Sequence, residues 1–312
     1  MIRLFALLFS RDRAMQVDAT LRSFLLHCQD APQVDLFVLY TATNPQHQRQ
    51  YAALAAEYRA YPAVHFVLEQ NFRRDTLALL AQHSGLAGWR LDLYRRSLSL
   101  GHHFSLLNRP LLGFSPPAYV LLLVDDNLFV GDFNAHAAVQ ALAAQPGAIG
   151  FSLRLGRNTT FCYALDRPQA LPEFQPLPGG LLKFDWTAGE YDFHYPLEVS
   201  SSIYRTDLIL KRLDRSWFRN PNTLESRLAD AWRAYERDTP WLLCYPQSVT
   251  FCNPVNQVES KYNNRSGVVH AYSNQYLADQ FDAGLRVNVA AYSGFTPNGC
   301  HQEQELLWMS HS

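Results

Sequence analysis

A short apolar run that ends on three polar side chains constrains this chain most. Residues Tyr119 to Val124 are almost wholly apolar and rich in Val and Leu, and Asp125, Asp126 and Asn127 follow directly. An apolar run of this length is typical of a strand buried on both faces, as in a parallel sheet. Acidic side chains at the carboxyl end of such a strand lie where open α/β sheets bind their ligands. The run therefore predicts an α/β fold with a polar site at the end of this strand.

The three polar residues admit two interpretations. Carboxylate and amide oxygens can hold a hard divalent cation such as Mg²⁺ or Mn²⁺, which in turn can bind a diphosphate. Asp and Asn are also favoured in turns, so the same residues can simply end the strand. This pattern alone leaves both interpretations open.

Composition places the chain among globular proteins with a sizeable core. Of its 312 residues, 48% are hydrophobic, and the formal net charge is −1. The basic residues come in scattered pairs rather than in one stripe, so no nucleic-acid partner is expected. The apolar run from Leu4 to Phe9 is too short to cross a bilayer and lacks the features of a signal peptide. No other run reaches transmembrane length, which predicts at most peripheral contact with the inner membrane.

The cysteines indicate a reducing compartment. There are five, an odd number, without a C-x-x-C pair or a Cys/His ligand spacing. Free thiols in the cytoplasm fit this usage best.

The first half of the chain alternates strand-like and helix-like segments, which predicts a parallel sheet with right-handed crossovers. The expected strands are 2–10, 34–40, 64–68 and 119–124, and the expected helices are 14–27, 45–60, 75–83 and 91–108. No G-x-G-x-x-G follows the first strand and no lysine-bearing phosphate loop is present, so dinucleotide and P-loop folds lose support.

The second half of the chain does not show the same regular alternation of strand-like and helix-like segments. A helix is expected over 133–144, a strand over 148–155, a Pro/Gly-rich loop over 168–180, a strand over 199–204 and a helix over 223–235. From Thr239 onward, short strands and loops rich in Asn, Tyr and Ser are expected.

Four motifs in this order carry a resemblance to a known family. They are Leu8–Asp18, Asp125–Asn127, Asp192–Pro196 leading to Ser202–Arg205, and Asn220–Glu225. Together they resemble the GT-A class of nucleotide-sugar glycosyltransferases, and within it bacterial family-2-like enzymes. The resemblance implies one GT-A (Rossmann-like) α/β domain with a mostly parallel sheet flanked by helices and an irregular C-terminal acceptor-side region. Residues 1–130 would form the nucleotide-sugar half and residues 131–312 the acceptor half.

The resemblance also implies an activity. A sugar would pass from a nucleoside diphosphate sugar to a glycan or lipid-linked acceptor, with inversion and with Mg²⁺ or Mn²⁺, as in bacterial polysaccharide biosynthesis. Asp125-Asp126-Asn127 looks like the D-x-D element of the family, with Asn in the third position. Asp125 would contact the donor ribose, and all three residues are candidate metal ligands.

Ser10, Arg11 and Arg13 follow the first strand and are the candidate nucleotide contacts, together with Glu69 after the third strand. Arg offers bidentate donors to phosphate or to a base carbonyl. The alternative is that these arginines belong to a solvated helix start, with Asp12 near the helix amino end.

Glu225 is the leading candidate for the catalytic base, since it lies where the resembling family keeps its acid. A carboxylate in the first turn of a helix is stabilised as an anion, which keeps it ready to accept a proton. First-turn Glu is equally common as a capping residue. Asp192 and Glu198, in an aromatic and acidic loop, are the rival candidates.

Two other functions stay open at this stage. Asn127 and the run Ser200–Ser202 depart from the family pattern, which favours a catalytically silent protein that binds a nucleotide or glycan. A sugar nucleotidyltransferase would need an early lysine, but the lysines are Lys183, Lys211 and Lys261. His270 and His301 are treated as structural or surface residues.

Overall fold

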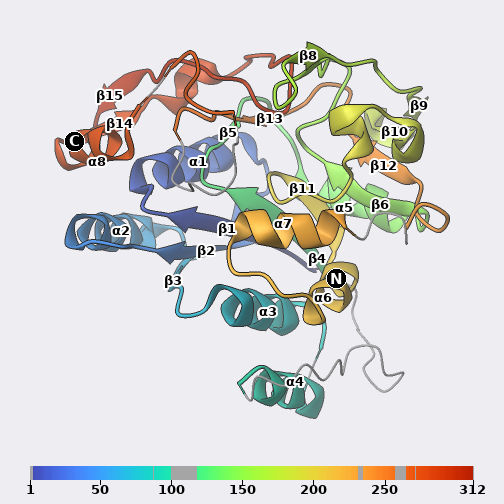
Figure 1. The fold of residues 1–312 in the computed structure, drawn as a ribbon, viewed down its shortest axis with the longest axis horizontal. Helices are drawn as coiled ribbons and strands as arrows, with labels where there is room; N and C mark the ends of the chain where they lie inside the picture. Colours follow the sequence, from blue (N-terminus) through green and yellow to red (C-terminus); the bar gives the residue numbers. More distant parts are fainter. Residues whose placement is uncertain are drawn as a thin grey trace.

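The computed structural model describes residues 3–86, 88–99, 118–230, 235–256, 265–270 and 272–311, and one central sheet crosses this part of the chain. Its strands are β1 (Arg3–Arg11), β2 (Asp35–Thr41), β3 (Val64–Leu68), β4 (Ala118–Val124), β6 (Ala148–Ser152), β9 (Gln175–Pro176), β10 (Leu182–Asp185), β11 (Ser202–Arg205) and β12 (Trp241–Cys244). They lie in the order β3-β2-β1-β4-β11-β6-β12-β10-β9 (Figure 1).

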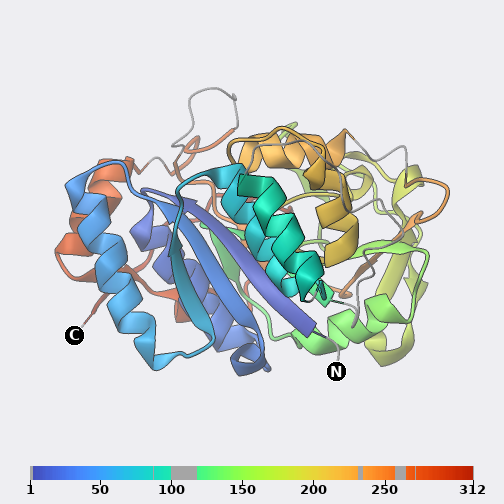
Figure 2. The ribbon, with the colours of Figure 1, turned by 90° about the horizontal axis from the view of Figure 1, so that it is seen from below.

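Helices cover both faces of the sheet. They are α1 (Ala14–His27), α2 (Pro45–Glu57), α3 (Phe72–His83), α4 (Trp89–Ser99), α5 (Ala135–Ala143), α6 (Thr206–Asp214), α7 (Pro221–Ala229) and α8 (Asn274–Asp282). Figure 1 shows α1 and α8 on one side of the strands and α3, α4 and α6 on the other, and Figure 2 shows α3 and α4 lying across that second face.

Three pairs of short strands lie outside the sheet. The pairs are β5 (Asn127–Phe129) with β13 (Thr250–Cys252), β7 (Phe161–Cys162) with β8 (Arg167–Pro168), and β14 (Leu285–Val287) with β15 (Trp308–Ser310). The short 3-10 helices are η1 (Ala31–Gln33), η2 (Tyr58–Ala60), η3 (Pro178–Gly180), η4 (Trp186–Ala188), η5 (Tyr191–His194) and η7 (Val289–Tyr292).

Strand β1 shows why the sheet needs helices on both faces. Its successive side chains point to opposite faces, and all six from residue 4 to residue 9 are buried. Leu4, Ala6 and Leu8 enter the core under α1 and α2, whereas Phe5, Leu7 and Phe9 enter the core under α3 and α6. Each fully buried Leu or Phe stabilises the fold by about 1.5–3 kcal/mol. The expected α/β fold with a sheet flanked by helices is therefore confirmed.

The mostly parallel sheet is confirmed, and each of its antiparallel pairs includes a strand from the second half of the chain. Strands β3, β2, β1 and β4 are parallel neighbours. Strand β11 instead runs antiparallel to both β4 and β6, and β10 runs antiparallel to β12. The sheet is thus mixed, because the chain reaches β11 through short strands and 3-10 helices, β9 and β10 among them, rather than through a helical crossover.

Several helix limits differ from the predictions, and α3, for example, begins at Phe72 rather than at residue 75. Helix α7 begins at Pro221, two residues before the predicted start, and the end predicted near residue 235 adjoins positions 231–234, which lie outside the described residues. The helix predicted over 91–108 is described only up to Ser99. Helices α6 and α8 were not predicted.

A glycine on β6 lets a tyrosine reach the loop that precedes β11. A Cβ at Gly150 would lie 2.8 Å from the ring of Tyr204, so a larger residue would displace that ring. The Tyr204 hydroxyl accepts a hydrogen bond from the Glu198 N–H at 2.9 Å and lies 3.0 Å from the Pro196 carbonyl. The close approach at Gly150 therefore holds residues 196–198 against the sheet.

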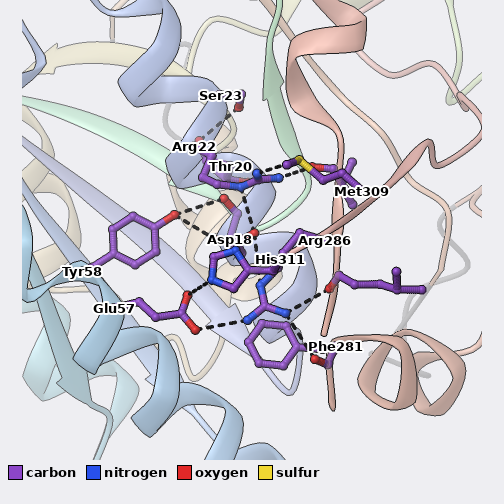
Figure 3. Close-up of polar contacts among 12 residues, drawn as sticks. Asp18, Thr20, Arg22, Ser23, Glu57, Tyr58, Phe281, Arg286, Met309 and His311 are labelled. Carbon is purple, nitrogen blue, oxygen red and sulfur yellow. Dashed lines mark hydrogen bonds and ion pairs between the residues drawn. The ribbon is translucent and has the colours of Figure 1, made fainter. Parts of the chain in front are cut away.

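A buried charged cluster fastens the last described residues to α1 and α2 (Figure 3). Asp18 on α1 is 1% exposed and accepts hydrogen bonds from Arg22 at 3.0 Å and from the Tyr58 hydroxyl at 3.0 Å. Arg286 on β14 approaches Asp18 at 3.7 Å and donates to Glu57 at 3.1 Å. Burial raises the pKa of Asp18, and Arg22 and Arg286 oppose that rise. The carboxylate therefore depends on these cations.

All five cysteines are buried, and none of them forms a disulfide. None of the described helices is both long enough and apolar enough to cross a membrane.

Candidate active site

A cavity of about 670 Å³ opens at the carboxyl ends of β1 and β4. This volume lies within the range of small-molecule sites. Eight of the ten predicted site residues line it, and they are Ser10, Arg11, Arg13, Glu69, Asp125, Asp126, Asp192 and Glu225. The structure thus brings together residues that are more than two hundred positions apart in the sequence, while their individual roles stay predictions.

Asp125 is held firmly at the end of β4. Its Oδ2 accepts a hydrogen bond from the Ser10 hydroxyl at 2.7 Å, and its Oδ1 accepts one from Arg13 at 2.9 Å. Arg13 also donates to the carbonyl of Asn256 at 2.7 Å. Burial lowers the pKa of Arg13, but Asp125 and Asp126 outweigh it, so the net shift is upward. Arg13 is therefore a buried partner of Asp125 and does not belong to a solvated helix start.

Asp126 has the less satisfied carboxylate of the two. Its Oδ1 is buried without a hydrogen-bond partner among the described residues, and its Oδ2 lies 3.9 Å from Arg13. Burial raises the pKa of Asp126, Arg13 opposes the rise and Asp125 adds to it. A buried acceptor without a partner is costly, so this oxygen has capacity for a ligand.

Asn127 does not reach the cavity. Its side chain is fully buried, where Oδ1 accepts the Val124 N–H at 2.9 Å and Nδ2 donates to the Ser200 carbonyl at 3.2 Å. The amide therefore closes the turn after β4 and links this turn to the segment that precedes β11. Since its polar atoms are used inside the protein, the metal role expected for Asn127 has no support in this geometry.

Arg11 and Glu69 lie at the open side of the cavity. The Arg11 side chain is 55% exposed, with its Nε 3.8 Å from Asp12. Asp12 itself is buried in the left-handed region at φ 57°, where its carboxylate accepts two hydrogen bonds from Thr43. This contact fixes the loop after β1, so Arg11 is presented at the cavity. Burial raises the pKa of Glu69, as does Asp75, and Arg11 lowers it.

Glu225 lies in the second turn of α7, and its expected place in the first turn is wrong. The helix is capped by Asn220, whose side chain accepts the N–H of Thr223 at 2.9 Å. Burial and the nearby Glu198 raise the pKa of Glu225 to about 7, against the opposing effect of Arg154 and a hydrogen bond from Tyr195. Burial and Glu198, rather than the helix dipole, therefore determine the direction in which the pKa of this carboxyl is shifted. A pKa near neutrality is what an efficient general base needs at neutral pH.

The two rival bases differ in access. Asp192 lines the cavity, where Oδ2 accepts a hydrogen bond from Gln169 at 3.2 Å, and burial raises its pKa while Arg154 opposes the rise. Glu198 is 1% exposed and lies outside the cavity lining. Its Oε2 accepts hydrogen bonds from the backbone and hydroxyl of Ser200. The geometry therefore gives no support to Glu198 as a base.

Arg154 and His301 are among the cavity residues that were not predicted as site residues from the sequence. Arg154 follows β6, is 3% exposed and lines the cavity. Its position after a buried strand, at the same edge of the sheet as Asp125, was the available signal. His301 also lines the cavity, and burial first and Arg154 second lower its pKa to about 3, so it is a neutral imidazole. No local sequence pattern around His301 predicts that it lines the cavity.

The aromatic residues between positions 184 and 195 divide between packing and the cavity. Phe184, Trp186 and Phe193 are fully buried, and the rings of Phe184 and Phe193 pack edge to face at 5.3 Å. Tyr191 and Tyr195 line the cavity instead.

Comparison with known proteins bears on the identity of this site. No family model matches the chain. Over 286 residues it is 23% identical to the bifunctional glycosyltransferase pgtA of Dictyostelium discoideum, an alignment that covers 82% of this chain and 32% of that protein. The chain is thus similar in sequence to a glycosyltransferase. This similarity agrees with the resemblance indicated by the motifs, while the family-2-like detail stays a prediction. The chain spans about a third of the length of the protein it matches.

Solved glycosyltransferase structures also overlap with it, at low similarity. S. aureus TarS shares 11% identity at a TM-score of 0.43, with 80% of this chain and 36% of that one covered. TarS 1–349 in complex with UDP-GlcNAc shares 11% identity at a TM-score of 0.41, with 87% of this chain and 62% of that one covered. The WbbM bifunctional glycosyltransferase shares 11% identity at a TM-score of 0.32, with 77% of this chain and 45% of that one covered. At such TM-scores the overlap does not itself establish a common fold.

Proposed function

We propose that this chain transfers a sugar from a nucleoside diphosphate sugar to a hydroxyl group of a glycan or lipid-linked acceptor, with inversion and with the help of a divalent cation. One observation carries the proposal: a single cavity joins the carboxylates at the end of β4 to Glu225, whose pKa is about 7. The sequence similarity to a glycosyltransferase supports it.

The end of β4 supplies the donor side. No group of three or more His, Cys, Asp or Glu side chains that could hold a metal occurs among the described residues. Mg²⁺ commonly needs only one or two carboxylates, since substrate phosphates and water complete its coordination. Asp126, with an oxygen that lacks a partner, fits such a set, and Asp125 lies beside it. A bound Mg²⁺ or Mn²⁺ would offset charge on the departing diphosphate.

The other donor contacts follow from position. Arg11 is presented at the cavity and can donate paired hydrogen bonds to a phosphate or a base carbonyl. Ser10 and Asp125, joined at 2.7 Å, form a polar edge suited to ribose hydroxyls. Glu69 lies on the same side of the site.

Glu225 supplies the acceptor chemistry. In the transfer, the acceptor oxygen forms a bond to the anomeric carbon while the bond from that carbon to the diphosphate breaks, and the diphosphate leaves with the electron pair. The acceptor proton passes to the Glu225 carboxylate. Tyr195, which donates a hydrogen bond to Glu225, keeps that carboxylate in place.

No observation favours the two competing functions, a catalytically silent binding protein and a sugar nucleotidyltransferase. The silent-protein hypothesis relied on Asn127 and on Ser200–Ser202. In the structure Asn127 closes the turn after β4, and Ser200 contacts Arg154 and Glu198. Lys183 lies over Trp241 and Lys211 pairs with Asp207, so neither is at the cavity. Lys261 lies outside the described residues. The buried unbonded cysteines agree with a reducing compartment, and the cytoplasm stays our proposed location.

The test begins by finding the donor through thermal shift with UDP, GDP, CDP and ADP, each with and without Mn²⁺, since a bound ligand raises the melting temperature. Glu225→Gln keeps the size of the side chain but cannot take a proton. Turnover should fall by about 10²–10⁴-fold while donor affinity, measured by calorimetry, is unchanged.

The matched control is Glu173→Gln, which removes an exposed carboxylate outside the cavity and should leave turnover at the wild-type level. Normal turnover in Glu225→Gln would remove Glu225 from the reaction and leave Asp192 as the base to test.

A further inference from the structure

A buried ion pair lies at the cavity that contains the proposed base. Arg154 donates from Nη1 to the Ser200 hydroxyl at 2.8 Å, and that hydroxyl donates to Glu198 Oε2 at 2.8 Å. The Arg154 Nε lies 3.8 Å from Glu198 Oε1, and both of these atoms lack a hydrogen-bond partner among the described residues. Arg154 and Glu198 are 3% and 1% exposed, so solvent screens their charges little.

The two members of the pair stand in different relations to the cavity. Arg154 lines it together with Glu225, whereas Glu198 lies outside the lining. The loop that carries Glu198 is also held by the Tyr204 hydroxyl, which bonds the backbone of Glu198. A buried ion pair is by itself weak evidence for stability, so its role at the adjacent cavity has to be considered.

We propose that Arg154 and Glu198 are positioning residues that set the pH range in which Glu225 accepts the acceptor proton, an inference that rests on the proposed role of Glu225 as the base. Arg154 favours the ionised carboxylate of Glu225, and Glu198 disfavours it. Their opposed effects hold the base close to neutrality, so it is ionised often enough to act and basic enough to take a proton.

The sign of each effect follows from charge. Burial raises the pKa of Glu225, Glu198 raises it further, and Arg154 and the hydrogen bond from Tyr195 lower it. Asp192 lines the same cavity, and Arg154 lowers its pKa as well, so the titration of Glu225 itself is also measured below. Since arginine stays protonated at any working pH, removing the charge of Glu198 leaves an uncompensated cation beside Glu225. The pKa of Glu225 must then fall, whereas removing Arg154 must raise it.

The experiment is the pH profile of kcat/KM between about pH 5 and pH 9, whose acid limb reports the free enzyme's base. Glu198→Gln should move that limb to lower pH by about one unit, and Arg154→Met should move it to higher pH by a similar amount. Arg154→Lys keeps the charge and should leave the limb near its wild-type position. The double variant Glu198→Gln/Arg154→Met, which lacks both charges, should return towards the wild type.

Arg205→Met is the matched control, because Arg205 donates to the carbonyls of Leu142, Gln145 and Ala148, outside the cavity lining. It should reduce stability without moving the limb. An acid limb that stays in place in Glu198→Gln, or that moves the same way in both single variants, overturns the proposal. If Arg154→Met does not fold, Glu198→Gln and Arg154→Lys still decide it.

Failure of the base assignment can be separated from failure of this inference. The carboxyl carbon of Glu225, labelled with ¹³C and assigned by its absence in Glu225→Gln, can be titrated by NMR without any turnover. Opposite shifts of that titration in the two single variants, together with normal turnover in Glu225→Gln, would keep the electrostatic coupling and reject the base. An unchanged titration would reject the coupling itself.

Discussion

Replacing Arg13 with Met would test how the carboxylate of Asp125 is held at the end of β4. The two side chains are 13% and 7% exposed, and their charged hydrogen bond is 2.9 Å long. Removing one partner of a buried pair leaves the other charge uncompensated, at a cost of about 3–5 kcal/mol. Asp125 keeps the hydrogen bond from Ser10, so we expect the lower part of that range.

Urea unfolding with linear extrapolation measures this loss. A total stability of about 5–15 kcal/mol is usual, so a loss of about 3 kcal/mol is readily resolved. The double variant Arg13→Met/Asp125→Asn removes both charges and should recover most of the loss. If only lost packing mattered, the double variant would be no more stable than the single one.

Arg74→Met is the matched control, since Arg74 forms a 2.9 Å pair with Asp75 but is 46% exposed. An exposed pair contributes about 0–1 kcal/mol, so this variant should be nearly as stable as the wild type. Equal losses in Arg13→Met and Arg74→Met would refute the reasoning, because burial would then make no difference.

Two further predictions concern the same region. Asp126→Asn should abolish the metal-dependent part of donor binding in calorimetry, yet raise the free energy of unfolding at neutral pH. Its pKa is raised in the folded state, so ionisation costs stability as pH rises, and the gain should vanish below about pH 4, where the wild-type carboxyl is protonated in both states. Unchanged metal dependence would count against Asp126 as a ligand. Ser201→Gly should raise the free energy of unfolding by about 1 kcal/mol, because Ser201 has φ 111° and such strain costs about 1–3 kcal/mol, partly offset by the entropy of Gly. Ser201→Ala keeps the Cβ and should show no such gain in the same denaturation assay.

The fold could be predicted best where residues are buried on both faces. Strands β1 and β4 each contain an unbroken apolar run, and α1 was predicted with its observed limits. Strand direction in the second half could not be predicted in this way. Strand β11 has four residues and follows β6 after some fifty residues of short strands and 3-10 helices, so no local pattern specifies that it runs antiparallel to β4.

The site was predictable to the extent that it follows from strand ends. Ser10 and Asp125 lie there because parallel strands share a carboxyl edge. Asn127 was misjudged because its partner, the Ser200 carbonyl, lies 73 positions away and is brought near only by the sheet. The pKa of Glu225 likewise depends on burial and on Glu198, from another element, whereas the sequence suggested a helix dipole.

The charged cluster around Asp18 has a consequence for synthesis on the ribosome. Asp18 and Glu57 are made early, whereas their partner Arg286 follows more than two hundred residues later. At about 5–20 residues per second, roughly 10–55 seconds separate them. During that interval Asp18 already has Arg22 beside it but lacks Arg286, so the β1–β4 half should be less stable than in the complete protein. A fragment that ends near residue 130 would lack β14, and the surface of α1 that β14 covers would be exposed.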